Sequence, residues 1–264
     1  MEIFHDPNAL CLSIVKAAKE LDFQRVRTLM SVETDKGLCP LLQISRKTDP
    51  GFPRILLSAG IHGDEPAGPH AVLELLRSEI GNPGFSNLIN LTSFPLINPS
   101  GFLNKTRTNR EEIDLNREFA KGHPSPEIRC LMDVLRNRTF ELSIEFHEDV
   151  DTKGFYLYEH FPDHKEPIGP EVISALEGSG FPILKDPVIE GMPAHNGIIQ
   201  PRKMRRVKFR RHGWPEALYL YRHGTRRTFT LETPALIDFS SRVQMHVLAF
   251  RTIVSTVVKE HQSR

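Results

Sequence analysis

Two histidines and a glutamate have the types and spacing of a metal site. His62 and Glu65 lie three residues apart in the turn after the apolar run 54–60, and His147 follows the alternating run 140–146. Imidazole nitrogen and carboxylate oxygen together suit a borderline ion such as zinc, and three protein ligands leave such an ion a free position. Among twelve histidines a His-x-x-Glu is expected about once by chance, and a lone histidine at a strand end is more often structural. The coincidence of both at strand ends favours a metal site.

A polar segment between residues 102 and 119 contains side chains that could bind a carboxylate. Arg107, Arg110, Asn116 and Arg117 lie in this segment, which follows an expected strand end. Open α/β sheets bind ligands beside the carboxyl ends of their strands, and arginine pairs with carboxylates while remaining charged. On composition alone, a solvated loop with local ion pairs is the alternative. Another carboxylate, Glu232, is expected at the end of a late strand.

The elements that must position these residues alternate along the chain. Apolar spacing predicts helices at 8–30, 71–80, 126–135, 170–179 and 241–257, and strands at 38–44, 54–60, 88–97, 140–146, 154–158 and 228–234. This alternation predicts an α/β fold with a mixed, largely parallel central sheet and helices on both faces.

Composition limits the classes of protein to consider. The chain has 264 residues, of which 39% are hydrophobic and 25% charged, as expected for a single globular domain spanning 1–264. A formal charge of +1 gives no overall field for nucleic acid or an anionic membrane. Three cysteines without metal-type spacing argue against a disulfide framework and favour a reducing compartment. With no signal peptide or membrane-spanning run, we expect a soluble, cytoplasmic protein.

One local exception to this neutrality is the segment 202–211, in which seven of ten residues are basic. Interleaved apolar residues could suggest nucleic-acid contact, but a single cluster in a neutral chain is weak support. A solvated excursion is the preferred interpretation. A position beside the pocket, where the segment would attract acidic substrates, is the alternative.

The order of the motifs resembles that of the zinc carboxypeptidases and of their relatives, the aspartoacylase and succinylglutamate desuccinylase group. The matching motifs occur between about residues 54 and 236 and are His62-Gly-Asp-Glu65, Asn98-Pro-Ser-Gly-Phe102, Arg107, Asp114-Leu-Asn116-Arg117, His147 and Leu231-Glu232-Thr-Pro. Asp-x-Asn-Arg after His-x-x-Glu is far more specific than either motif alone.

This resemblance implies a zinc-dependent amide hydrolase. One zinc ion would be held by His62, Glu65 and His147. Glu232 would be the general base that takes a proton from metal-activated water and passes it to the leaving nitrogen. Arg107 would polarise the scissile carbonyl together with the metal.

The resemblance also assigns the surrounding residues. Asn116 and Arg117 would hold the substrate carboxylate, and Asp114 would orient the first histidine. Arg110 is the alternative carbonyl-polarising arginine if the segment has a different register. Glu118 departs from the asparagine common in the family and places a negative charge next to the expected carboxylate pocket.

The expected substrate is a small peptide or an N-acyl amino acid with a free carboxylate. A metallocarboxypeptidase that removes a C-terminal residue is favoured, because little chain follows the Glu232 strand where the aspartoacylase group has a further domain. A deacylase of N-acyl amino acids and a non-catalytic carboxylate-binding protein are the alternatives. The sequence makes no prediction about oligomeric state.

Overall fold

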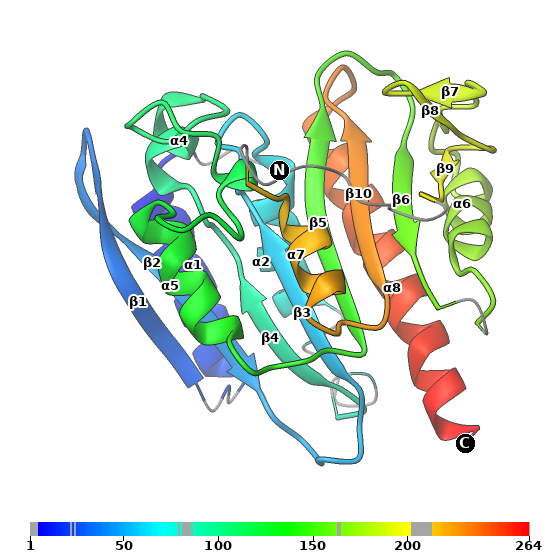
Figure 1. The fold of residues 1–264 in the computed structure, drawn as a ribbon, viewed down its shortest axis with the longest axis horizontal. Helices are drawn as coiled ribbons and strands as arrows, with labels where there is room; N and C mark the ends of the chain where they lie inside the picture. The colour runs from blue at the N-terminus through cyan, green and yellow to red at the C-terminus, as the bar shows by residue number, and fades with distance from the viewer. Residues whose placement is uncertain are drawn as a thin grey trace.

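The computed structural model describes residues 5–21, 23, 25–78, 80, 85, 87–162, 165–201 and 213–263. Within these residues, eight strands form one sheet in the order β1-β2-β4-β3-β5-β10-β6-β9 (Figure 1). The strands are β1 (Arg25–Thr34), β2 (Gly37–Arg46), β3 (Arg54–Ala59), β4 (Asn90–Phe94), β5 (Leu142–Asp149), β6 (Tyr156–His160), β9 (Ile198–Ile199) and β10 (Thr228–Pro234). The central strands β4, β3, β5 and β10 are parallel, whereas β2 runs antiparallel to β4 and β6 runs antiparallel to β10. The predicted mixed, largely parallel α/β sheet is confirmed.

Helices cover both faces of this sheet, also as predicted. One face carries α1 (Pro7–Glu20), α2 (Ala67–Arg77), α6 (Gly169–Gly178) and α8 (Phe239–Gln262), whose apolar side chains form the larger core with the strands. The opposite face carries α5 (Pro126–Leu135) and α7 (Glu216–Arg222), which pack a second core. Figure 1 shows α5 and α7 in front of the sheet and α1, α2 and α8 behind it. None of the described helices combines the length and apolarity needed to cross a membrane.

Strand register places the candidate site at one edge of the sheet. Glu232 on β10 pairs with His147 on β5, and Ala59 at the end of β3 pairs with Phe146. The parallel strands therefore all deliver their carboxyl ends to the edge where His62 follows β3. Since side chains alternate along a strand, His147 and its neighbours Phe146 and Glu148 point to opposite faces.

The N-terminal helix prediction was wrong beyond residue 20. The helix was expected to reach residue 30, but α1 ends at Glu20 and residues 25–34 form β1. β1 is an edge strand that pairs with β2 along its length, from Arg25 opposite Ser45 to Thr34 opposite Gly37. Its burial pattern is irregular, so the strand lacks the clean alternation by which a strand is detected.

Three other segments contain more structure than the sequence indicated. α4 (Pro99–Asn104) begins where a turn was expected, and the side chain of Asn98 accepts the Gly101 N–H as its N-cap. A hairpin of β7 (Val188–Ile189) and β8 (Met192–Pro193) lies in the Pro- and Gly-rich region. α7 also begins at the end of that region. The basic segment 202–211 lies outside the described residues, and the predictions for it stay predictions.

Candidate active site

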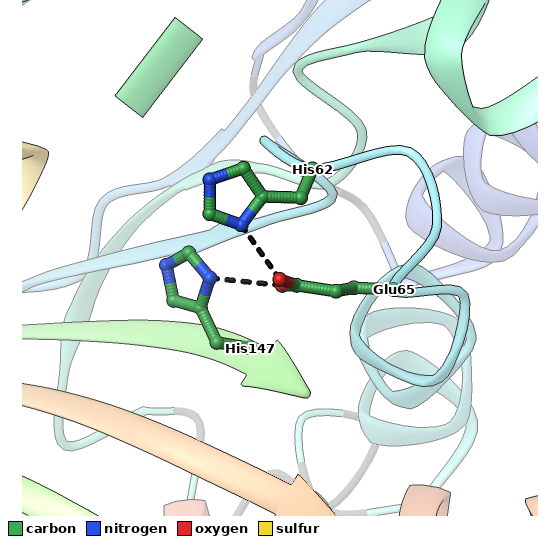
Figure 2. A group of neighbouring side chains, drawn as sticks. All are labelled: His62, Glu65 and His147. Carbon is green, nitrogen blue, oxygen red and sulfur yellow. Dashed lines mark hydrogen bonds and ion pairs between the residues drawn. The ribbon is translucent and has the colours of Figure 1, made fainter. Parts of the chain in front are cut away.

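His62, Glu65 and His147 converge in the structure (Figure 2). His62 Nδ1 lies 2.6 Å from Glu65 Oε1, and His147 Nδ1 lies 2.8 Å from Glu65 Oε2. The possible ligand atoms of all three side chains lie within 4.8 Å of one another. Each of these residues is at most 4% exposed. The three side chains therefore form a compact, nearly enclosed donor set.

The backbone after β3 explains how His62 and Glu65 reach this point. Gly60 has a positive φ of 62°, and its carbonyl accepts the Asn98 N–H at 2.8 Å. The turn then passes so close to α4 that a Cβ on Gly63 would lie 1.9 Å from the carbonyl carbon of Gly101. Glycine is required at such a close approach of two backbones.

Electrostatics favours an ionised carboxylate between the two imidazoles. Burial opposes the charge on Glu65, but His147 and His62 together lower its pKa below the ordinary value. Burial lowers the pKa of His147 despite the neighbouring Glu65. For His62, burial is outweighed by Glu65 and Asp114, which raise its pKa. A negative carboxylate and a neutral imidazole are the forms that bind a metal.

Asp114 lies beside the second ring nitrogen of His62, where the resemblance placed it. Its Oδ1 atom is 3.3 Å from His62 Nε2 and also accepts the Asn116 N–H at 2.9 Å as the N-cap of a short 3₁₀ turn, η1 (Leu115–Arg117). Its Oδ2 atom accepts from Arg107 Nε at 3.2 Å. Burial raises the pKa of Asp114, but the hydrogen bond from His62 and the positive charge of Arg107 lower it overall.

The two candidate arginines occupy different places. Arg107 Nη1 lies 3.7 Å from Glu65 Oε1, so the guanidinium borders the three converging side chains. Arg110 Nη1 instead pairs with Glu33 of β1 at 2.9 Å. The geometry therefore favours Arg107 as the arginine of the site and ties Arg110 to the edge strand.

Asn116 is buried, and a hydrogen bond fixes which way its side-chain amide points. Its Oδ1 atom accepts the backbone N–H of Glu216 at 2.8 Å, so Nδ2 must face the other way. Nδ2 makes no hydrogen bond to any other described residue. Arg117 is exposed next to it and donates from Nη1 to the Asn116 carbonyl at 2.8 Å.

The side chain of Glu118 is engaged inside the protein. Its Oε2 atom accepts the N–H of Ser125 at 3.1 Å, at the start of α5, and its other oxygen pairs with Lys121. These two partners compensate the negative charge that the sequence placed next to the carboxylate pocket.

Glu232 lies across from His147 and has a different environment from Glu65. Within the described residues its carboxylate makes no hydrogen bond or ion pair, and the residue is partly exposed. Burial first, and then the negative charges of Glu65, Glu190 and Asp149, raise the pKa of Glu232 well above its ordinary value. A carboxyl group whose pKa is raised in this way accepts a proton more readily than an ordinary carboxylate.

The comparisons with known proteins agree with this geometry. Residues 51–180 match the family profile of the succinylglutamate desuccinylase/aspartoacylase catalytic domain. A candidate metallopeptidase from Shewanella denitrificans is 27% identical, with a TM-score of 0.81 over 96% of this chain and 91% of that one. Its counterpart from Shewanella amazonensis is 26% identical, with the same TM-score over 96% of this chain and 94% of that one. The chain is thus similar in fold and in its motifs to the zinc carboxypeptidases and to the succinylglutamate desuccinylase/aspartoacylase group. The family resemblance inferred from the motifs is confirmed.

Other similar proteins, matched over a shorter stretch or at lower identity, carry the carboxypeptidase name or that fold. Carboxypeptidase D of Mus musculus is 29% identical over 149 residues, which cover 44% of this chain and 11% of that protein. The chain thus spans about a tenth of the length of that relative. Bovine thrombin-activatable fibrinolysis inhibitor, solved with tick carboxypeptidase inhibitor, is 17% identical with a TM-score of 0.67, covering 97% of this chain and 98% of that one. This last likeness shows the zinc carboxypeptidase fold alone.

Several acidic residues near the site were not singled out from the sequence. Glu145 and Glu216 are buried together, and Glu216 Oε2 accepts from Ser58 Oγ at 3.0 Å. Glu145 Oε2 lies 3.9 Å from His147 Nε2. The position of Glu145, two residues before a candidate ligand on the same face of a strand, was the available signal. No sequence pattern pointed to Glu216, which lies in α7 directly after the basic segment, where no helix was predicted.

Proposed function

We propose that the chain is a zinc-dependent amide hydrolase, and more specifically a metallocarboxypeptidase that removes the C-terminal residue of a peptide. The observation that carries this proposal is the convergence of His62, Glu65 and His147 beside Arg107. Glu232, which makes no hydrogen bond or ion pair to another described residue, lies in register with His147 at the same sheet edge.

The three residues fit zinc by the chemistry of their donors. Both histidines direct Nδ1 to the same carboxylate, and their Nε2 atoms face Asp114 at 3.3 Å and Glu145 at 3.9 Å. A carboxylate at hydrogen-bond distance, as Asp114 is from His62, characteristically partners a metal-binding histidine and fixes its tautomer. When bound, zinc would polarise the scissile carbonyl and lower the pKa of water.

The protein's own side chains would perform the proton transfer and the positioning. Glu232, with its raised pKa, would take the proton of the attacking water and donate it to the leaving nitrogen. Arg107 would donate hydrogen bonds to the carbonyl oxygen as negative charge develops on it. Its bond to Asp114 holds the guanidinium at the border of the site.

Asn116 and Arg117 would bind the free carboxylate of the substrate. The Glu216 N–H holds Asn116 Oδ1, so Nδ2 is the atom available as a donor to that carboxylate. Arg117 is exposed and would add a positive charge. Such recognition selects substrates with a terminal carboxylate over their amides.

A deacylase of N-acyl amino acids is the second candidate function. The match of residues 51–180 to the succinylglutamate desuccinylase/aspartoacylase catalytic domain favours it. Both reactions cleave an amide next to a carboxylate-bearing group, so the same residues would serve either.

A substrate panel tests the proposal and separates the two candidates. Zinc-loaded protein would be offered peptides that differ in their C-terminal residue, the same peptides as C-terminal amides, and N-acetyl and N-succinyl amino acids. We expect release of the C-terminal residue from the free acids, with little release from the amides. Turnover of N-acyl amino acids alone would establish the second candidate. No turnover of any member by zinc-loaded protein would refute both.

A further inference from the structure

Glu148 connects the two chain segments that supply the proposed ligands. It follows His147 on β5, but its side chain points to the opposite face of the sheet and is fully buried. Its Oε1 atom accepts the N–H of Ala67 at 2.6 Å. Ala67 is the first residue of α2, two residues after Glu65. A single hydrogen bond therefore links the backbone after Glu65 to the strand of His147.

This bond also completes the start of α2. The first N–H groups of a helix lack partners within the helix, and the residue at the N-cap of α2, Pro66, provides no side-chain cap. Glu148 supplies the missing acceptor from another element. Helix α2 and strand β5 also approach each other closely here: a Cβ on Gly68 would lie 3.0 Å from the Cβ of Phe146.

The second oxygen of Glu148 is held by α8. Arg242, in the first turn of that helix, donates from Nη1 to Glu148 Oε2, and its side chain is 12% exposed. The guanidinium also lies 5.3 Å from the ring centroid of Phe239. A buried carboxylate depends on such a partner, because removal of one member leaves the other charge buried and uncompensated.

One turn later, α8 contacts the same strand again. The ring of His246 stacks on Phe146 with 4.4 Å between centroids, and its Nε2 atom lies 3.3 Å from Thr233 Oγ1. Thr233 in turn donates to the backbone carbonyl of His147 at 3.5 Å. α8 thus supports the residues on either side of His147.

We propose that Glu148 and Arg242 are positioning residues that hold Glu65 and His147 at metal-binding separation. Helix α8, which contributes none of the converging side chains, would thereby set the affinity for the metal. The inference rests on the metal role proposed above. The pair contacts no ligand side chain in the described structure and acts only through the backbone of the two ligand-bearing segments.

A matched ion pair at the other end of α8 provides the control. Arg227, which is 4% exposed, lies 3.4 Å from Glu260 near the end of α8 and donates to the carbonyl of Glu166 at 2.7 Å. It also ties α8 to the sheet, but it precedes the first residue of β10, whereas Glu232, in register with His147, lies near the end of that strand. Arg227→Gln should therefore reduce stability without changing the metal site.

The test compares zinc affinity with stability in the folded protein. Zinc affinity would be measured by chelator competition, and stability by denaturant unfolding of the metal-free protein, for Glu148→Gln, Glu148→Leu and Arg227→Gln. We expect the zinc dissociation constant to rise about tenfold or more for Glu148→Leu and less for Glu148→Gln, whose amide oxygen can still accept from Ala67. Arg227→Gln should stay within about twofold of the wild type, as expected away from the ligand shell.

A double variant separates positioning from stability if the single variants fold poorly. Glu148→Leu combined with Arg242→Met replaces the buried charges by apolar groups, a change that often restores stability. We expect the double variant to regain stability relative to Arg242→Met alone while its zinc affinity stays low. Wild-type affinity in the stable double variant, or equal affinity changes in the Glu148 and Arg227 variants, would overturn the inference. Failure of the wild type itself to bind zinc would instead refute the proposed function.

Discussion

The backbone N–H of Glu216 is hydrogen-bonded to Oδ1 of Asn116 at 2.8 Å. An N–H can only donate, so the atom that it meets must be the oxygen, and the amide nitrogen of Asn116 is directed elsewhere. Only 7% of the residue is exposed. A buried amide whose Nδ2 has no partner among the described residues is suited to donate to a ligand.

Asn116→Asp should therefore weaken substrate binding selectively. The aspartate keeps an oxygen for the Glu216 N–H but replaces the donor by a second negative oxygen, which repels a substrate carboxylate. We expect KM for a free-acid substrate to rise at least about tenfold, the loss typical of one charge-assisted hydrogen bond, with a smaller change in kcat. Steady-state kinetics on a free acid and on its amide measure the effect. A rise in KM for both substrates alike would contradict a carboxylate-binding role.

Zinc binding should require both histidines. His62→Ala and His147→Ala each remove one of three donors, so we expect both variants to lose stoichiometric zinc in elemental analysis after dialysis. His195→Ala is the matched control, because His195 is exposed and lies outside the converging group. Full zinc content in both site variants would show that the metal role is wrongly assigned.

Glu232→Gln should keep zinc and fold while losing turnover. The amide preserves the shape of the side chain but cannot accept a proton, and general acid–base assistance contributes about a hundredfold to ten-thousandfold. We expect kcat to fall within this range while the zinc content is unchanged. Glu190→Gln is the control, since Glu190 is an exposed carboxylate that also raises the pKa of Glu232. A near-native rate in Glu232→Gln would exclude this residue as the base.

The two arginines should respond differently to substitution. Arg107 borders Glu65 and is bonded to Asp114, whereas Arg110 is paired with Glu33. Arg107→Gln should therefore lower kcat by about a hundredfold or more, as expected for the loss of one stabilising donor. Arg110→Gln should leave kcat nearly unchanged, because an exposed ion pair contributes little. The reverse order of effects would reassign the role to Arg110.

The sequence predicted the three converging residues better than it predicted the residues that position them. His62, Glu65 and His147 follow apolar runs, and in parallel strands such runs are long enough to be recognised. The resemblance favoured Arg107 and kept Arg110 as the alternative, and the contact that separates them in the structure, between Arg110 and Glu33 on β1, could not be predicted from spacing. That strand was itself missed, since its edge position leaves the hydrophobic pattern irregular.

Glu148 and Glu216 could not be predicted from the sequence for a related reason. Glu148 is adjacent to His147 in the sequence, but its partners Ala67 and Arg242 come from two helices that are distant along the chain. Which helices cover which face of a sheet depends on the global topology, and periodicity within one segment does not contain that information. Glu216 was harder still to predict, because it contacts Asn116 through its backbone N–H. Every residue except proline has this group, so the residue type could not indicate the contact.

Glu216 should also make the stability of the protein depend on pH. It is fully buried against Glu145, and burial raises its pKa to about 7 even though Ser58 donates to it. Burial and the charge of Glu216 raise the pKa of Glu145 as well. Two adjacent buried carboxyl groups favour retention of a proton between them.

The sign of the effect follows from the proton balance. Below the ordinary carboxyl pKa, Glu216 is protonated in both the folded and the unfolded chain, so its titration does not change the free energy of unfolding. Above it the unfolded chain loses the proton that the folded chain keeps, so the free energy of unfolding falls as pH rises toward about 7. The slope is roughly 1.4 kcal/mol for each pH unit within this window.

Glu216→Gln should remove the contribution of this residue. The glutamine can accept from Ser58 and donate to Glu145 without a titrating proton, so the variant should lose the part of the decline between pH 5 and 7 that Glu216 contributes, while Glu145, whose pKa burial also raises, still titrates. Denaturant unfolding of metal-free wild type and variant across this window gives the difference curve, in which the contributions of other groups cancel. We expect the variant to gain stability relative to the wild type as pH rises. Parallel curves would show that Glu216 titrates alike in the folded and unfolded chains and that the buried pair holds no proton.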